Sequence, residues 1–224
     1  MRRALGEPPR RLLAIVVVTG LLGGLVGAAY LALLKGVQHV LGPSAWSAPA
    51  HLVVLVAVGG AVALLTRWLG NPSDVELLVD NIHVLGGAED VRSLRSLIPV
   101  SLLCIGAGGA LGPEAPLVTT TGSLGSWIGA RARLDRDDLR IVTIAGMAAG
   151  FTVLFGAPLG SAVFALEILH RKGLEYYEAL LPSAIGALCG YAVYAGATGL
   201  GLRPVFEFPA IGPLRLADLG WGAA

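Results

Sequence analysis

The chain has 224 residues, of which 55% are hydrophobic and 14% are charged, with a formal net charge of +1. A soluble domain carries about 25% charged residues, so this composition excludes an ordinary soluble domain and favours a protein that lies mainly in a lipid bilayer. The near-neutral charge leaves no basic surplus, and no nucleic-acid partner is expected.

The apolar segment at residues 12–34 predicts the first membrane helix. It is longer than the apolar region of a secretory signal peptide, so we expect it to be retained after a basic N-terminus at residues 1–11. A second span is expected at residues 51–69. Residues 70–96 hold most of the mid-chain charge and include ELLVDNIHVL, which favours a short helix.

The apolar run at residues 97–111 is too short to cross a bilayer alone. It leads to the sequence GPEAP at residues 112–116, where a new helix is expected to begin. Pro116 fits the first turn of that helix, because its missing N–H would be unpaired there in any case. We expect the helix to continue to about Ala130.

The charged segment RARLDRDDLR at residues 131–140 predicts a surface loop, with Asp137 or Asp138 as the N-cap of the following helix. The next apolar segment, at residues 141–170, is interrupted by Gly-Ala-Pro at residues 156–158. A proline two residues after a glycine favours a break in the helix, so this segment predicts two half-length helices rather than one long span.

A last span is expected at residues 179–197, so that residues 12–197 form one membrane domain. The tail at residues 198–224 is rich in proline and ends in what resembles the start of another membrane helix, with Asp218 as a possible cap. We therefore expect an extracytoplasmic tail and a chain that is an N-terminal fragment, from a truncated or split gene.

The positions of lysine and arginine predict the orientation, because basic residues gather on the cytoplasmic side of a membrane. The basic N-terminus, the segment at residues 131–140 and the pair Arg171-Lys172 share one side if the intervening segments cross and return in pairs. We therefore expect a multi-pass protein of the cell membrane with a cytoplasmic N-terminus. The predicted fold class is all-α, a polytopic helical bundle with broken and re-entrant helices.

Glycine is frequent, at 32 of the 224 residues. Soluble helices avoid glycine, whereas membrane helices use it to bring their backbones close together. Pairs of glycines four residues apart recur along the chain, which predicts a tightly packed helical bundle. These pairs are Gly23 and Gly27, Gly108 and Gly112, Gly125 and Gly129, Gly146 and Gly150, Gly156 and Gly160, and Gly186 and Gly190.

Glu114 is the best-specified candidate for a functional residue. A glutamate at membrane depth costs about 2.5–3.5 kcal/mol and therefore usually faces a cavity. Glu114 also begins a predicted helix, whose first N–H groups are unpaired and attract anions. A mobile anion can compete with the carboxylate for these groups, which would make Glu114 a gate. A glutamate in a first turn is also a common surface cap, and the local sequence leaves both interpretations open.

Three segments, in this order, resemble the CLC family of chloride channels and chloride–proton antiporters. The third follows the family pattern G-x-A-A-G-x-x-x-x-F-x-A-P-L-x-G-x-x-F-x-x-E closely over more than twenty positions. The second keeps the glycine, glutamate and proline of the family motif, but Pro113 stands for a basic residue and Ala115 for a glycine. The segments are GNPSDVE at 70–76, GPEAPLVTTTGSLGSWIG at 112–129, and GMAAGF, FGAPLG and FALE within 146–167.

The resemblance covers about residues 12–200 and implies one of the two inverted repeats of a CLC-like fold. It implies that Glu114 is the gating glutamate, and that the backbone at Gly112, Ala115 and Leu117 lines the anion-binding site. Ser73 is a further anion-binding candidate, because it is adjacent to the position of the central serine ligand of the family.

Glu167 matches the glutamate that ends the third motif, and it is a candidate for a proton path. Many proton-coupled members have a second acidic residue directly after it, whereas this chain has Ile168. Members of the family pair as homodimers, so a homodimer or an assembly with a second repeat is expected. No metal and no cofactor is expected.

The sequence therefore predicts a chloride channel or an anion/proton antiporter, represented here by its first half. One alternative is a non-conducting helical fragment or subunit that assembles with a separate second half. Another is a transporter of a different anion, such as fluoride or nitrate. An intramembrane enzyme has no support, because no serine–histidine pair, aspartate pair or metal-ligand group occurs at predicted membrane depth.

Overall fold

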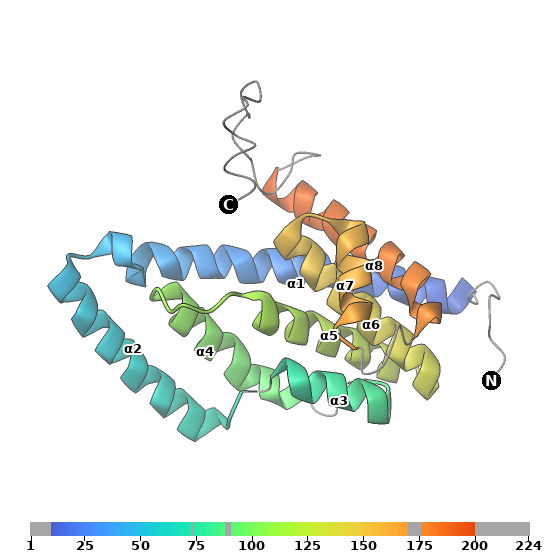
Figure 1. Cartoon of the computed structure of the whole chain (residues 1–224), viewed down its shortest axis with the longest axis horizontal. Coiled ribbons are helices and arrows are strands. Elements are labelled where there is room, and N and C mark those ends of the chain that lie inside the picture. The colour runs from blue at the N-terminus through green and yellow to red at the C-terminus, as the bar shows by residue number, and fades with distance from the viewer. Residues whose placement is uncertain (1–9, 73, 88–90, 170–175, 200–224) are drawn as a thin grey trace, which may run out of the picture.

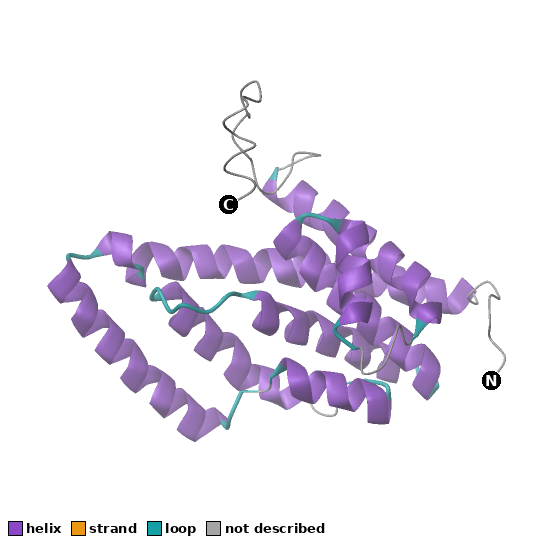
Figure 2. Cartoon of the chain, in the orientation of Figure 1, coloured by secondary structure: helices purple, strands orange, loops and turns teal. Residues whose placement is uncertain are grey.

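The computed structural model describes residues 10–72, 74–87, 91–169 and 176–199, and all regular elements in these ranges are helical (Figure 2). The predicted all-α fold class is therefore confirmed. In chain order the elements are α1 (Arg10–Leu41), the 3-10 helix η1 (Pro43–Ala45), α2 (Ala48–Leu69), α3 (Val75–Leu85), η2 (Val91–Ser93), α4 (Leu94–Gly106), α5 (Glu114–Arg131), α6 (Arg136–Phe155), α7 (Pro158–Glu167), η3 (Tyr177–Ala179) and α8 (Leu180–Thr198).

Four of the described helices are long and apolar enough to cross a membrane, namely α1, α2, α6 and α8. The shorter α4 is also apolar. This arrangement fits the multi-pass membrane protein that the composition predicts. The tail at residues 200–224, Asp218 and the basic pair at 171–172 lie outside the described residues.

Helix α6 is the centre of the bundle, with 83% of its apolar length buried. Helices α1, α5, α7 and α8 pack around it (Figure 1). Small residues allow these close approaches. A Cβ atom added at Gly146 of α6 would lie 3.2 Å from the carbonyl carbon of Thr121 in α5, and one added at Gly190 of α8 would lie 3.0 Å from the Cβ of Ala149. The position of α5 in the bundle is thus fixed by backbone contact with α6.

Helices α1 and α8 also cross at glycines. A Cβ added at Gly24 would lie 2.7 Å from the Cα of Gly190, and one added at Gly20 would lie 2.9 Å from the Cα of Gly186. The predicted pair Gly186 and Gly190 therefore marks a real contact between helices, whereas its partners Gly20 and Gly24 were not among the predicted pairs.

Helix α2 diverges from α1 and packs mainly on α4 (left in Figure 1). It has no buried residue along its whole length. Its exposed side chains include Val53, Val56 and Trp68. Because these side chains are apolar, α2 presents a surface suited to lipid or to further protein.

Most predicted spans agree with the helices, with shifts at their ends. Helix α1 extends to Leu41, seven residues beyond the predicted end, whereas α4 ends at Gly106 rather than at residue 111. Helix α5 begins at Glu114, as the GPEAP sequence indicated, and the short helix predicted within 70–96 is α3.

Two predictions around α6 are wrong. The N-cap is Asp135, not Asp137 or Asp138, because the Asp135 carboxylate accepts the Asp138 N–H at 2.9 Å. Helix α6 therefore has 20 residues and is not half-length. Only α7, with 10 residues, is short. The break between them is as predicted, since Gly156 ends α6 with φ +66° and Pro158 begins α7.

We predict that Gly24→Ala destabilises the fold, because the new methyl group overlaps the backbone of Gly190. The expected loss is about 1–3 kcal/mol of unfolding free energy, measured by titration with sodium dodecyl sulfate in mixed micelles. The matched control is Gly36→Ala in the same helix, where an added Cβ has nothing within 4 Å. It should leave stability unchanged or raise it by up to about 1 kcal/mol, because alanine favours helix. Equal effects of the two substitutions would contradict the proposed α1–α8 contact.

Candidate functional site at the start of helix α5

The loop at residues 107–113 joins α4 to α5 and carries the candidate gate. Its first part is a compact turn, in which the Gly108 and Gly109 N–H groups donate to the carbonyls of Ile105 and Cys104 at 3.0 and 2.9 Å. Gly108 has φ +100°, a conformation that glycine adopts without strain. Residues 108–112 are exposed, so this loop is held by few packing contacts.

Glu114 is the first residue of α5, and its side chain is exposed. The carboxylate lies against Gly112, where an added Cβ would overlap Oε2 and lie 2.7 Å from Oε1. Only glycine at position 112 leaves room for this side-chain conformation. Within the described ranges, no hydrogen bond or ion pair holds the Glu114 carboxylate.

The backbone N–H groups of this first turn are not equivalent. The Leu117 N–H donates to the Pro113 carbonyl at 3.0 Å and is therefore used within the helix. Pro116 has no N–H, and the Glu114 and Ala115 N–H groups have no acceptor among the described residues. Of the three backbone candidates, Ala115 thus offers a free donor at the helix start, and Gly112 makes the space beside it.

The first candidate segment, at residues 70–76, is described only in part, because Ser73 lies outside the described residues. Next to it, Asp74 caps α3 by accepting the Leu77 N–H at 2.7 Å. The Ser96 hydroxyl donates to the Gly70 carbonyl at 2.6 Å, which ties this segment to α4. The described part of this segment therefore has a capped helix start and one hydrogen bond to α4.

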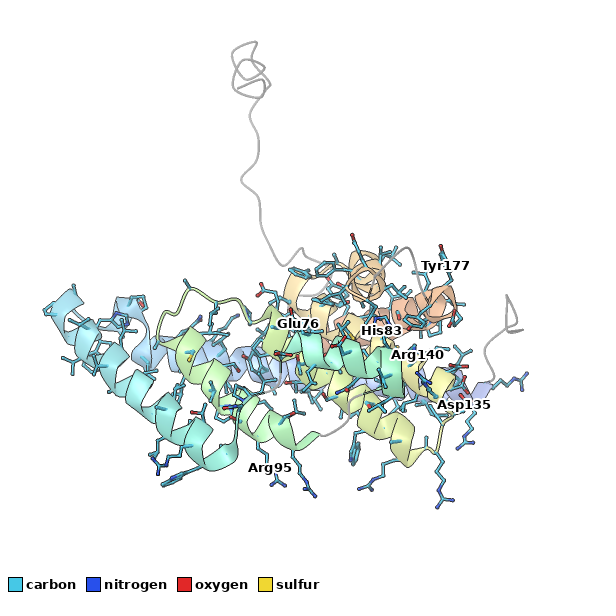
Figure 3. All side chains as sticks on the ribbon, turned by 60° about the horizontal axis from the view of Figure 1, so that its bottom comes forward. Glu76, His83, Arg95, Asp135, Arg140 and Tyr177 are labelled. Atoms are coloured by element: carbon cyan, nitrogen blue, oxygen red, sulfur yellow. The ribbon has the colours of Figure 1, made fainter. Side chains whose placement is uncertain are left out.

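At the other end of α3, two arginines of α6 hold the helix in place, and one of them, Arg140, is labelled in Figure 3 together with His83 of α3. Arg136 donates to the His83 carbonyl at 2.7 Å, and Arg140 donates to the Ile82 carbonyl at 3.2 Å. The ring of Tyr176 lies under Arg140, with 4.6 Å from the guanidinium carbon to the ring centroid. Cations at the C-terminal carbonyls of a helix are stabilising, so this contact fixes α3 and the segment at its start.

Glu167 is the last residue of α7, and its side chain is exposed. No hydrogen bond or ion pair joins it to Glu114 in the part of the chain that the structure describes. The structure thus brings Glu114, Gly112 and Ala115 together at the start of α5, whereas Glu167 ends a different helix.

Sequence reasoning missed a polar stretch inside α5, although the run of three threonines was visible. Thr120 and Thr121 donate to the carbonyls of Pro116 and Leu117 at 2.7 and 3.0 Å. The Thr119 hydroxyl is buried, with 2% of the residue exposed, and has no partner in the described structure. A buried hydroxyl of this kind normally finds a partner, so this face of α5 is suited to further polar contact.

Comparisons with known proteins show the family to which the chain belongs. The sequence pattern of the family described as voltage gated chloride channel matches residues 73–224. A protein of Pseudomonas syringae pv. tomato named chloride/fluoride channel protein is 31% identical over 77% of this chain and 38% of its own length. The H(+)/Cl(-) exchange transporter ClcA of Vibrio campbellii is 28% identical over 91% of this chain and 47% of its own length.

The fold has a counterpart among solved structures. A slow cyanobacterial Cl-/H+ antiporter superposes with a TM-score of 0.75 and 22% identity, over 96% of this chain and 53% of that protein. The chain belongs to the voltage-gated chloride channel family, also called the CLC family, whose members are channels and exchangers rather than enzymes. It spans less than half the length of the curated relatives it matches.

We predict that Gly112→Ala displaces the Glu114 carboxylate, because the new methyl group takes the space that the carboxylate occupies. The measurement is the carboxyl ¹³C resonance of Glu114 in the chain labelled with ¹³C-glutamate and reconstituted in lipid. The control is Gly160→Ala, whose Cβ would have an ordinary contact of 3.7 Å with Ala157. A shift with Gly112→Ala alone is expected, and an unmoved Glu114 resonance would refute the contact.

Proposed function

We propose that this chain forms one half of an anion pathway for chloride, with Glu114 as its gate. The observation that carries the proposal is the start of α5, where a carboxylate without a partner lies beside the free Ala115 N–H. The relatives named as chloride channels and exchangers support this reading of the site.

The gate works by competition for one positively polarised position. The start of a helix carries about half a positive charge, which favours an anion next to its free N–H groups. When the carboxylate of Glu114 turns toward this position it excludes a chloride ion. When it turns away or takes up a proton, chloride replaces it. No hydrogen bond has to break for this movement, because the carboxylate has none among the described residues.

A second repeat completes the pathway in this proposal. The chain matches about half of the cyanobacterial antiporter, and residues 108–112 with Glu114 and Ala115 lie exposed on one surface. A second, inverted repeat against this surface would enclose the site. The remaining anion ligands, Ser73 included, would then surround the ion together with the start of α5.

A homodimer would form through α7 and α8. An apolar groove of about 370 Å³ runs between these helices. Leu159, Val163 and Leu181 line it and are exposed in the single chain. Within a bilayer the hydrophobic effect does not drive this association, and van der Waals packing of these side chains against a second copy would favour it instead.

The proposed orientation places the N-terminus in the cytoplasm, on the positive-inside rule. The α1–α2 turn, the loop at residues 107–113 and Glu114 then face the extracytoplasmic side. Glu167, at the end of α7, faces the cytoplasm and is available to a proton path. Because Ile168 stands where many proton-coupled members have a second acid, we favour an anion channel over a tightly coupled antiporter.

Fluoride is a second candidate ion. The 31% identical relative is named a chloride/fluoride channel protein, and in this chain Pro72 stands at the position of the family's central serine ligand, with Ser73 next to it. Parallel flux measurements with chloride, fluoride and nitrate would rank the three ions.

We predict that Glu114→Gln raises anion flux at neutral pH and flattens its pH dependence, because the amide is neutral at all pH values. Flux is measured as efflux from liposomes that contain this chain completed by its second repeat. The increase should be at least about tenfold, corresponding to about 1.4 kcal/mol. The control is Glu178→Gln, an exposed carboxylate in η3.

Two results would count against the proposal in different ways. Equal flux and equal pH dependence for Glu114→Gln and the wild type would remove Glu114 from the gate. No flux of any anion in the completed protein would favour the rival interpretation, a non-conducting fragment or subunit in which Glu114 only caps a helix.

A further inference from the structure

The turn between α1 and α2 lies directly against the loop that carries Glu114. A Cβ added at Gly108 would lie 3.1 Å from Cδ of Pro43 in η1 and 3.7 Å from Cε1 of His51 in α2. A cavity of about 480 Å³ lies between the end of α1, η1 and this loop, and Pro113 lines it. The position of the loop is therefore coupled to the α1–α2 turn and not only to α4.

One side-chain hydrogen bond joins the two segments. The Nε2 atom of His51 lies 2.9 Å from the carbonyl oxygen of Ala107, the first residue of the loop. A carbonyl oxygen can only accept, so Nε2 carries the proton and Nδ1 is the atom left to gain one. The neutral ring and the imidazolium both donate through Nε2, but the charged donor makes the stronger bond. Taking up a proton therefore tightens this contact instead of breaking it.

The loop has little else to hold it on this side. Its backbone hydrogen bonds in the described structure run within the α4–α5 connection, where the N–H groups of Ala107, Gly108, Gly109 and Leu111 donate to the carbonyls of Leu103, Ile105, Cys104 and Gly109. Residues 108–112 are exposed and four of the five are glycine or alanine, so side-chain packing contributes little. The His51 bond thus ties the start of this loop to a helix outside the connection.

Several other titratable groups lie near this end of the fold. Lys35 and His39 lie in the last two turns of α1, Tyr30 lies further back on α1 and its hydroxyl donates to Ser101, and Cys104 lies on α4. Glu114 stands at the far end of the loop. None of these groups forms a hydrogen bond or ion pair with His51 in the described structure. The imidazole itself is therefore the group whose charge acts on Ala107.

We propose that His51 is a positioning residue for the gate, and that its protonation stiffens the loop at residues 107–113 and so holds Glu114 in place. An imidazolium at this position would strengthen the bond to Ala107, because a charged donor makes a stronger hydrogen bond than a neutral one. The gating consequence and the side of the membrane rest on the function proposed above. The effect of His51 on the loop does not depend on that proposed function.

The test measures the loop itself. Leu111, with 68% of its surface exposed, is replaced by cysteine in a chain that carries Cys104→Ser and Cys189→Ser. The chain is reconstituted in lipid nanodiscs, and the rate of modification by a membrane-impermeant methanethiosulfonate is measured at pH 8 and pH 5.5. Three versions are compared: His51, His51→Gln, whose amide can donate the same bond without titrating, and His51→Leu, which cannot donate.

At pH 8 we expect equal rates for His51 and His51→Gln, and a rate about two- to tenfold higher for His51→Leu, as the loss of one hydrogen bond predicts. At pH 5.5 the rate with His51 should fall roughly fivefold below that with His51→Gln, because the charged donor binds more strongly. Dividing the modification rate with His51 by the rate with His51→Gln at each pH removes the intrinsic pH dependence of the thiol.

A His51→Leu rate equal to that of His51 would overturn the positioning role. A His51 to His51→Gln ratio that is the same at both pH values would overturn the effect of protonation. Glu178→Cys in η3, used in place of Leu111→Cys, reports on the fold as a whole and should not change. If the modification rate at Glu178→Cys changes in His51→Leu, that variant has altered the fold as a whole. The comparison of His51 with His51→Gln is then the only test of the proposal. No transport is measured, so this result stands or falls independently of anion flux.

Discussion

Backbone contact between α5 and α6 fixes the position of α5, at whose start the proposed anion site lies. Gly146 and Gly150 of α6 leave no space for a side chain against Thr121 of α5. The two helices therefore meet at their backbones, and α5 cannot slide along α6 without a clash. Because α5 is held along its buried length, the position of its first turn is set by the bundle. The loop before it then needs only to deliver Glu114 to that position.

The first turn of α5, at the proposed gate, differs from the rest of the helix because the first N–H groups of a helix have no partner within it. On one side, Leu117 is buried and its N–H is used within the helix. On the other side, Glu114 and Ala115 are exposed and their N–H groups have no acceptor in the described structure. A firmly held helix with an open first turn suits an ion that must bind and leave. The carboxylate of Glu114 is the one component of this site that moves in the proposed mechanism.

Much of the fold was predictable because membrane helices are read from long apolar runs and from breaks at glycine and proline. The start of α5 at Glu114 and the break at Gly156 and Pro158 followed directly from these signals. The start of α6 did not, since Asp135, Asp137 and Asp138 are all suitable caps by residue type. Only the bond from the Asp138 N–H to Asp135 distinguishes them, and that is a fact of three-dimensional geometry.

The candidate site was predictable to the same degree. The motif identified Glu114 and Gly112, and the structure adds the reason for the glycine, which is the space taken by the carboxylate. The contact between His51 and Ala107 joins residues 56 positions apart, and no periodicity or motif in the sequence indicates it. Contacts of this kind depend on how α2 packs against the end of α4, which a single sequence does not encode in a readable pattern.

The most direct measurement is the position of a bound halide in the completed protein. Crystals of the Glu114→Gln variant, grown with bromide, would show the ion by its anomalous scattering. We expect a bromide ion within hydrogen-bonding distance of the Ala115 N–H, at the position that the carboxylate excludes in the wild type. Bromide bound elsewhere in the protein, with none at the start of α5, would contradict the assignment of this helix start as the gated anion site.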